Sequence, residues 1–537
     1  MKYTITHLDK ETLLQHSLEY RVKLILKNNK NKMISSLNGI VAVGNLTIDS
    51  DSDIRRQLSF TISLDEEEQA AEKLFTSYIG NYFSLEIGIF SFDKSNYIYY
   101  PAGDYLITDA GTSYHSRDNS ISFQLSDRIA ELNGTINGQL GAKPETLIPV
   151  EKEDGSLTTI QDAIITFIRS QTNIERYIVN EVGELNGFQT FNENDAGYRE
   201  ENVLWNKLPY DLTFDAGCTV YDILTTFRDL YPNYQVYMDV YGSLCFDMVP
   251  SCEHDMIVLD NDFLQQILLS EQVNYDRTQI RNITEVFGKC HTIDRFAADC
   301  QWDEKTNTIL SLNLSDYKEN KTQIISLKFQ EEKDISCLND HPIKIEQNNT
   351  LYELYHEYSK EQVTRKELKP DTLYSIKYHS ENAKNCFYFL GEPQPHAICV
   401  LSDDEFYQNT TIEKYIADKF DCTNIFVKNV EKSPFSIQRL GPLLDVKYSG
   451  EFDNITSDTV ALTNAKYYNE RSTMMFDTIT LTTKLIPFLD VQQKITYQKQ
   501  QDTEEHAYVT KSISHDFSSG TSTITLYRFY PLITTNQ

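Results

Sequence analysis

Short runs in which apolar and polar residues alternate recur along the first part of this chain and constrain its fold more than any other feature. A period of two places successive side chains on opposite faces, which is typical of half-buried strands. Gly, Asp or Asn residues separate the runs, as expected for antiparallel neighbours. The first 140 residues are therefore predicted to form a β-barrel or sandwich. The runs lie at 20–27, 58–64, 83–92, 105–108 and 120–125.

Composition supports a strand-rich chain, because 34 Tyr and 27 Phe accompany only 20 Gly among the 537 residues. Aromatic side chains suit a half-buried pleated surface. One helix is predicted within the first β segment, from Glu66 to Gly80, which serves as the C-cap. A length of 537 residues also exceeds what one compact core holds, so the chain is predicted to contain several units.

From about residue 145 the pattern changes to α+β. Thr159-x-x-Asp162 and Thr219-x-x-Asp222 each open an amphipathic helix, and residues 235–246 indicate a hairpin. Further along, a helix is predicted over 457–475. Strands are predicted at 282–287, 309–314, 323–329, 478–482, 507–513 and 522–529, and an aromatic segment covers 374–378 and 386–391.

The charge balance narrows the possible partners. Lys and Arg total 49 against 79 Asp and Glu, a net charge of −30. That balance argues against gripping nucleic acid or docking on an anionic membrane, both of which need positive charge. Residues 1–20 lack the apolar core of a signal peptide, and no apolar run is long enough to span a membrane. Nine widely spaced cysteines favour reduced thiols, so we expect synthesis in a cytosol.

No motif predicts catalysis. Nucleotide-binding glycine loops and the serine elbow are absent, and among 79 acidic residues a pair placed for glycoside hydrolysis stays possible without a motif that favours it. The acidic clusters at 65–68 and 403–405 are interpreted as solvated faces. We therefore expect a protein that is not an enzyme, with no catalytic, cofactor-binding or metal-binding residue and no cofactor.

Four short segments resemble parts of metal-binding motifs. Asp49, Asp51 and Asp53 resemble the start of a calcium loop, but the required glycine and glutamate positions hold Ile54 and Phe60, so a solvated turn is predicted. His356-Glu357 lacks the second histidine of a zinc helix. The pairs Cys252/His254 and Cys290/His291 do not have the spacing of a structural zinc site.

Several short segments, in their order along the chain, resemble the tail hub and baseplate hub proteins of tailed bacteriophages and contractile injection systems. The first shared motif is a Gly-x-Tyr-x-Ile strand, followed by a strand that leads to Asp and a short helix. The second is a Tyr-x-Asp-x-x-Gly-x-Leu-x-Phe hairpin. The third is a Tyr-Asp pair before an Asn-x-x-x-Val-x-Gly strand, and the last is a Phe-Tyr-Pro ending. The corresponding segments are Gly103–Ile107, Ser122–Leu132, Tyr237–Phe246, Tyr275–Asp276, Asn282–Gly288, Pro487–Val491 and Phe529–Pro531.

The resemblance implies a multi-domain, β-rich α+β fold with two antiparallel β-barrel-like domains and inserted α+β domains. The first barrel-like domain would span 1–140 and an α+β domain 141–255. The second barrel-like domain would combine 256–335 with 476–537, around an inserted α+β domain at 336–475. The resemblance is weakest over about residues 300–450.

By the same resemblance, the chain would be a structural virion protein at the phage tail tip or baseplate, made in the bacterial host cytoplasm. It would form a homotrimer that closes the distal end of the tail tube and forms part of the genome-ejection channel. Its expected partners are the distal tail or tube protein, the tape measure protein and tail-tip spike or receptor-binding proteins, with no membrane span. Since Gln537 directly follows the last predicted strand, no hydrolase module is expected.

One alternative stays open, a carbohydrate-binding or depolymerising receptor-binding protein of the tail tip, in which exposed tyrosines stack on sugars. A count of only 2 Trp speaks mildly against it. On the hub interpretation, phage DNA passes through the ring without specific binding. Part of the negative charge is then expected to line the channel and repel the phosphates.

Overall fold

The computed structural model describes most of the chain between Tyr3 and Arg528, and the following account is restricted to those residues. Within that range it leaves out 29, 39–42, 64–79, 116–117, 142–144, 150–151, 153–155, 181–206, 209–210, 232–233, 250–255, 290–294, 304–307, 311–321, 330–341, 348–349, 357–360, 365–366, 369–372, 382–383, 404–408, 423 and 475–476.

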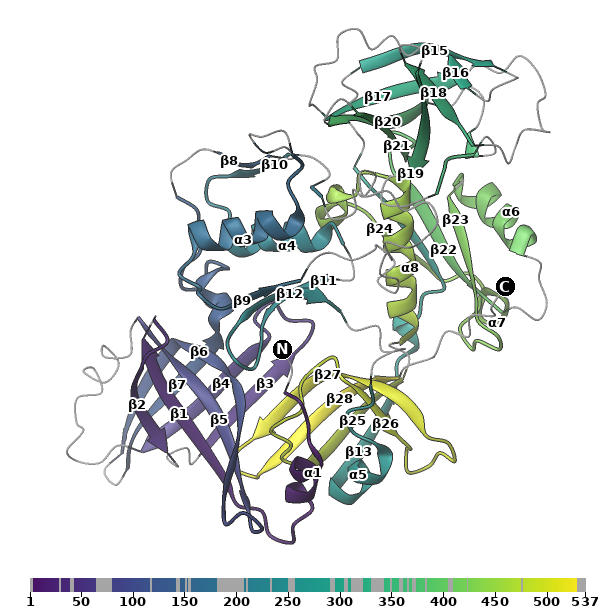
Figure 1. The fold of residues 1–537 in the computed structure, drawn as a ribbon. Coiled ribbons are helices and arrows are strands. Elements are labelled where there is room, and N and C mark those ends of the chain that lie inside the picture. The colour runs from purple at the N-terminus through teal and green to yellow at the C-terminus, as the bar shows by residue number, and fades with distance from the viewer. Residues whose placement is uncertain are drawn as a thin grey trace.

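One 12-stranded sheet, in the lower part of Figure 1, contains strands from both the first and the last part of the chain. Its strand order is β13-β25-β28-β27-β3-β4-β7-β6-β5-β1-β2, and β26 pairs with β27 beside this path. The strands are β1 (Tyr20–Asn28), β2 (Met33–Asn38), β3 (Val43–Asp49), β4 (Arg56–Ser63), β5 (Asn81–Ser91), β6 (Asn96–His115), β7 (Asp118–Asp127), β13 (Leu268–Tyr275), β25 (Asp477–Lys484), β26 (Lys494–Tyr497), β27 (His506–Asp516) and β28 (Thr521–Arg528).

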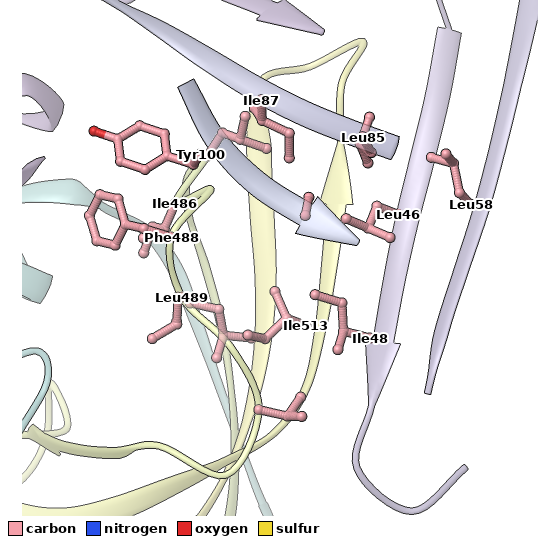
Figure 2. Close-up of a cluster of buried hydrophobic side chains, with 14 of the residues drawn as sticks. Leu46, Ile48, Leu58, Leu85, Ile87, Tyr100, Ile486, Phe488, Leu489 and Ile513 are labelled. Atoms are coloured by element: carbon pink, nitrogen blue, oxygen red, sulfur yellow. The ribbon is translucent and has the colours of Figure 1, made fainter. Parts of the chain in front are cut away.

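The two parts of this sheet join where β27 pairs antiparallel with β3, over Ser512–Asp516 and Asn45–Asp49. A single hydrophobic core spans the joint, with Leu46 and Ile48 from the first part and Phe488 and Ile513 from the last (Figure 2). Helices α1 (His7–Leu13) and α5 (Asn261–Ile267) pack against the same core. The first and last β segments are therefore one folding unit.

An α+β unit follows β7 in the chain. Its helices α3 and α4 contact each other beside the three-stranded sheet β11-β12-β9. Both helices begin as the sequence predicts, because the hydroxyls of Thr159 and Thr219 accept the backbone N–H of Asp162 and Asp222. Its elements are η2 (Arg128–Glu131), β8 (Glu145–Ile148), α3 (Ile160–Gln171), β9 (Tyr177–Val179), β10 (Leu212–Asp215), α4 (Val220–Asp229), β11 (Tyr234–Met238) and β12 (Leu244–Met248).

The remaining segment contains a closed seven-stranded barrel, β15-β16-β18-β19-β21-β20-β17, and a four-stranded sheet, β23-β22-β14-β24. Helix α8 contacts the inner strands β14 and β22 of that sheet, and α6 contacts its edge strand β23. The elements are η4 (Arg277–Gln279), β14 (Ile283–Phe287), β15 (Arg295–Asp303), β16 (Thr308–Leu310), β17 (Thr322–Phe329), β18 (Lys344–Gln347), β19 (Thr350–His356), β20 (Leu373–Glu381), β21 (Lys384–Gly391), β22 (His396–Ser402), α6 (Asn409–Phe420), β23 (Ile425–Asn429), α7 (Ile437–Leu440), β24 (Leu444–Lys447), η7 (Gly450–Asn454) and α8 (Asp458–Met474).

This arrangement confirms a β-rich, multi-domain chain with several sheets and some helices. The predicted grouping of 256–335 with the last β segment differs from the strand pairing. Only β13 pairs there, whereas β14 joins the four-stranded sheet and β15–β17 join the barrel. Likewise, 336–391 contributes barrel strands rather than an α+β unit. Alternation within a strand does not specify which distant strand it pairs with, which explains the difference.

The predicted helix over 66–80 lies outside the described residues apart from Gly80, and the predicted strand 309–314 is described only over Thr308–Leu310. Among the described residues, no helix is both long and apolar enough to cross a membrane.

Candidate assembly surface

A buried ion pair fixes three parts of the chain at one point. Arg56, at the start of β4, is fully buried, and its Nη2 donates to both carboxylate oxygens of Asp490 at 2.8 and 2.7 Å. Its Nη1 donates to the carbonyl oxygen of Met238 at the end of β11. The first β segment, the α+β unit and the last β segment therefore meet at a single guanidinium group.

A second arginine and an aspartate extend this junction. The guanidinium of Arg55 lies 4.0 Å from the ring centroid of Tyr237 and donates to Gln235 Oε1 at 2.9 Å. Asp127 accepts the backbone N–H of Arg56 at 3.0 Å. Burial raises the pKa of Asp127 to about 6 and lowers the pKa of Arg55. Burial therefore disfavours the charged forms of Asp127 and Arg55, and the hydrogen bonds and the neighbouring Arg56–Asp490 pair offset this cost.

Two further clusters connect the units. Asp51, in the turn between β3 and β4, pairs with Arg471 of α8 at 2.5 Å and with Lys511 of β27 at 3.4 Å. Asp104, on β6, pairs with Arg176 of the α+β unit at 2.5 Å. Sequence reasoning missed both clusters, since the paired residues are distant in the chain, as for Arg471, which lies 420 residues after Asp51. The turn predicted at Asp49–Asp53 is confirmed, and Asp51 forms ion pairs between units there.

His515 lies at the joint between the two parts of the sheet, where it faces Leu46 of β3. Its Nδ1 is 2.8 Å from the hydroxyl of Ser522, and burial lowers its pKa from 6.5 to about 4. Because the unfolded chain takes up this proton near pH 6.5 and the folded chain only near pH 4, stability is lost as the pH falls across that window.

We therefore expect His515→Gln to reduce the loss of stability between pH 6.5 and 4. At about 1.4 kcal/mol per pKa unit, the wild-type histidine contributes a loss of roughly 3 kcal/mol. The measurement is the urea midpoint at a series of pH values. His7→Gln, at an exposed position of α1, is the control and should follow the wild type. Parallel pH profiles for wild type and His515→Gln would contradict the assignment.

Both ends of the 12-stranded sheet are edges: within the described part of the chain, no strand pairs with the outer side of β2 or of β13. Large apolar side chains are exposed at each edge. Met33 and Ile34 on β2 are 59% and 53% exposed, and Leu269 and Tyr275 on β13 are 58% and 60% exposed. Unpaired strands of this kind are templates for pairing with another chain.

The two edges carry opposite charge. Lys30 and Lys32, in the turn that leads into β2, are both exposed. On β13, Glu271 accepts hydrogen bonds from the backbone of Gln500, in the loop that also carries the exposed Glu504 and Glu505. An edge with lysines and an edge with carboxylates on the same sheet can meet head to tail between copies.

Those candidate catalytic or metal-binding residues that the structure describes do not form a common site. Among the described residues, no group of three His, Cys, Asp or Glu side chains is placed to hold a metal. His356 Nε2 contacts Glu367 at 2.5 Å, and Asp403 is buried and accepts from Arg439 at 2.9 Å, so the interpretation of Asp403 as a solvated face is wrong. Cys252/His254, Cys290/His291 and 65–68 lie outside the described residues.

Comparison with known proteins gives one matching family model and a set of similar solved structures. A family model described as a domain of unknown function, DUF5048, matches residues 432–533. No curated protein matches the sequence. Solved structures cover nearly the whole chain at low identity.

Three of these structures are tail proteins. The 43 kDa tail protein of prophage MuSo2 from Shewanella oneidensis has 9% identity and a TM-score of 0.43, over 94% of this chain and 98% of that one. The tail protein from Neisseria meningitidis MC58 has 8% identity and a TM-score of 0.44, over 96% and 97%. Prophage tail protein gp18 from Listeria monocytogenes EGD-e has 7% identity and a TM-score of 0.34, over 94% of each chain. The chain is thus similar to phage tail proteins.

Proposed function

We propose that this protein is a non-catalytic structural component of a phage tail tip, a hub that closes the distal end of the tail tube as a homotrimer. The two parts of the shared sheet act as the two β-barrel-like domains of each subunit. Distal tail or tube, tape measure and tail-tip proteins bind to this ring, which forms part of the genome-ejection channel in the virion.

The observation that carries this proposal is the single sheet with two open edges of opposite charge. An edge that pairs with the other edge of the next copy forms a heterologous contact, and such contacts close into a ring when the rotation allows it. The resemblance of the ordered sequence segments to hub proteins supplies the number of three subunits. The buried Arg56 junction supports the proposal because it holds the sheet and the α+β unit as one rigid part.

A charge exchange across the two edges tests the proposal. We expect Lys30→Glu with Lys32→Glu to raise the concentration at which trimers form at least about tenfold, since about 1.4 kcal/mol corresponds to tenfold. Glu504→Lys with Glu505→Lys should have the same effect. The protein carrying all four substitutions should regain assembly, because opposite charges meet again. Mass in solution, measured by light scattering over a concentration series, gives the answer.

A wild-type protein that stays monomeric at micromolar concentration would overturn the proposal. Trimers that are unaffected by either pair of substitutions would show that other surfaces make the contact. The expected non-catalytic role is tested by incubation with peptidoglycan and host polysaccharide, which should be recovered unchanged.

Sugar stacking on exposed tyrosines, the alternative function, finds no support on the outer face of β5 and β6. Arg21 lies 4.3 Å from the ring centroid of Tyr97, and Lys23 lies 5.1 Å from that of Tyr99. The Tyr99 ring also lies close to Gly88, where a Cβ would be 2.8 Å from it. Both rings are thus in contact with neighbouring residues of the sheet.

A further inference from the structure

One face of the 12-stranded sheet carries uncharged polar side chains over seven neighbouring strands, which we call the neutral face. Along a single row, partner residues of successive strands are all Ser, Thr or Gln. Adjacent rows continue with Gln272, Thr480, Thr525 and Ser512, with Asn45, Ser59 and Gln124, and with Thr61 and Ser122. The first row is Ser270, Thr482, Thr523, Ser514, Thr47, Gln57 and Ser126.

This composition is not what solvation alone predicts. Charged residues make up 24% of the chain, and they are normally concentrated on solvated surfaces. Thr47, Gln57 and Gln124 are exposed, and Ser514 is half-buried. Glu271 of β13 and Arg56 of β4 belong to rows between those of the neutral face. The charged residues next to the neutral face lie at its borders: Asp49, Lys511 and the turn residue Asp51 at one end, Lys484 and Asp516 at the other, and Asp109 beside it on β6.

The same sheet provides a contrast within one molecule. The outer surface of β1 and β5 carries Arg21, Lys23 and Glu86, and the last two form an ion pair at 2.8 Å. The distribution of charged side chains therefore differs along the sheet: they are present on the outer surface of β1 and β5 and absent from the neutral face.

The chemistry of the neutral face limits what it contacts. It lacks the large apolar side chains that anchor a protein partner, and it lacks the cations that hold phosphates. Its nearest carboxylates, those of Asp49, Asp109 and Asp516, lie at its borders, so that only its middle presents no negative charge to a polyanion. Hydroxyl and amide groups exchange hydrogen bonds with water at little net cost. Such a surface suits brief contact with a hydrated polymer.

We infer that the neutral face is the part of the ring that faces passing double-stranded DNA, and that DNA slides past hydroxyl and amide groups rather than being repelled by acidic ones. This inference rests on the proposed function, since it needs a ring. It replaces the expectation that part of the −30 net charge lines the channel. The acidic residues then serve other surfaces, such as the loop with Glu504 and Glu505 beside β13.

Cysteine labelling locates the neutral face in the assembled protein. Cysteine is placed singly at Thr47, Gln57 or Gln124, and as controls at the exposed Thr166 of α3 and Gln266 of α5. In the trimer, cysteines on the neutral face should react with a small maleimide at the control rate. With a maleimide on a long poly(ethylene glycol) chain they should react at least about tenfold more slowly than the controls, because a narrow ring excludes the polymer.

Lysines at the same positions test whether DNA can reach the neutral face. The variant Thr47→Lys, Gln57→Lys, Gln124→Lys should bind a linear DNA duplex at least about tenfold more tightly than wild type, with affinity that falls as salt rises. A control with Thr166→Lys, Gln266→Lys and Gln279→Lys adds the same charge elsewhere and should stay close to wild type.

The outcomes separate the two claims. A protein that never forms a trimer overturns the proposed function and this inference together. A trimer in which the neutral-face cysteines react equally with both reagents, or with neither, leaves the hub standing and overturns the inference, because that face is then outside the ring or buried against protein. Equal DNA binding by the two lysine variants, or DNA binding by the wild type through this face, also overturns it.

Discussion

Replacing Arg56 with methionine is expected to destabilise the protein by about 3–5 kcal/mol, the usual cost of removing one partner of a buried ion pair. Methionine retains an unbranched apolar stem but leaves the Asp490 carboxylate buried without its cation. The carbonyl oxygen of Met238 loses its donor as well, so the α+β unit should detach more easily from the sheet. The measurement is the urea midpoint of unfolding, followed by near-ultraviolet circular dichroism.

Two comparisons show whether the charge itself is responsible. The double variant Arg56→Met, Asp490→Asn removes both charges and should recover much of the loss, since an uncompensated buried ion is the main cost. Lys152→Met breaks the ion pair with Asp162, whose side chains are 42% and 52% exposed, and should cost at most about 1 kcal/mol. Equal effects of Arg56→Met and Lys152→Met would show that the junction does not hold the units together.

Sequence reasoning succeeds in this chain where the determinants are local. The helices after Thr159 and Thr219 follow from a capping residue and an apolar stripe within a dozen positions. The hairpin of β11 and β12 follows from an Asp-x-x-Gly turn between two short alternating runs. In each case, the residues that specify the element also lie inside it.

Sequence reasoning fails where two paired strands lie far apart in the chain. Nothing within residues 45–49 specifies Ser512–Asp516 as the neighbouring strand, although this pair joins the two parts of the sheet. In the barrel, β16 pairs in parallel with β18 and β19 with β21. Parallel neighbours are separated by crossovers, so turn residues give no indication of the partner.

The candidate assembly surface was hidden from sequence for a related reason. The segments around Asp51 and Asp104 give no indication of an ion pair, and their importance appears only when the fold brings Arg471 and Arg176 to them. The neutral face is a property of seven strands together. One strand of alternating Thr is ordinary, and the absence of charge becomes informative only when the strands are placed side by side in register.

The second large effect is expected at Gly242, in the turn between β11 and β12. A Cβ there would lie 2.0 Å from Oδ2 and 2.4 Å from Cγ of Asp104, on a backbone with a φ of +74°. Asp104 is buried and cannot move aside without losing Arg176 and the hydroxyl of Ser84. Gly242→Ala should therefore cost about 1–2 kcal/mol for the left-handed backbone and a further ~1–3 kcal/mol for the overlap.

Gly217→Ala separates these two contributions. Gly217 also has a positive φ, +95°, but nothing lies within 4 Å of the Cβ that would be added. It should therefore show the backbone cost alone, and the difference between the two variants measures how closely the hairpin approaches the sheet. If both alanine variants shift the urea midpoint equally, Asp104 yields to the new methyl group, and the contact between the α+β unit and β6 is looser than the structure indicates. If Gly242→Ala costs clearly more, the glycine of the Tyr-x-Asp-x-x-Gly hairpin is required by this contact as well as by the turn.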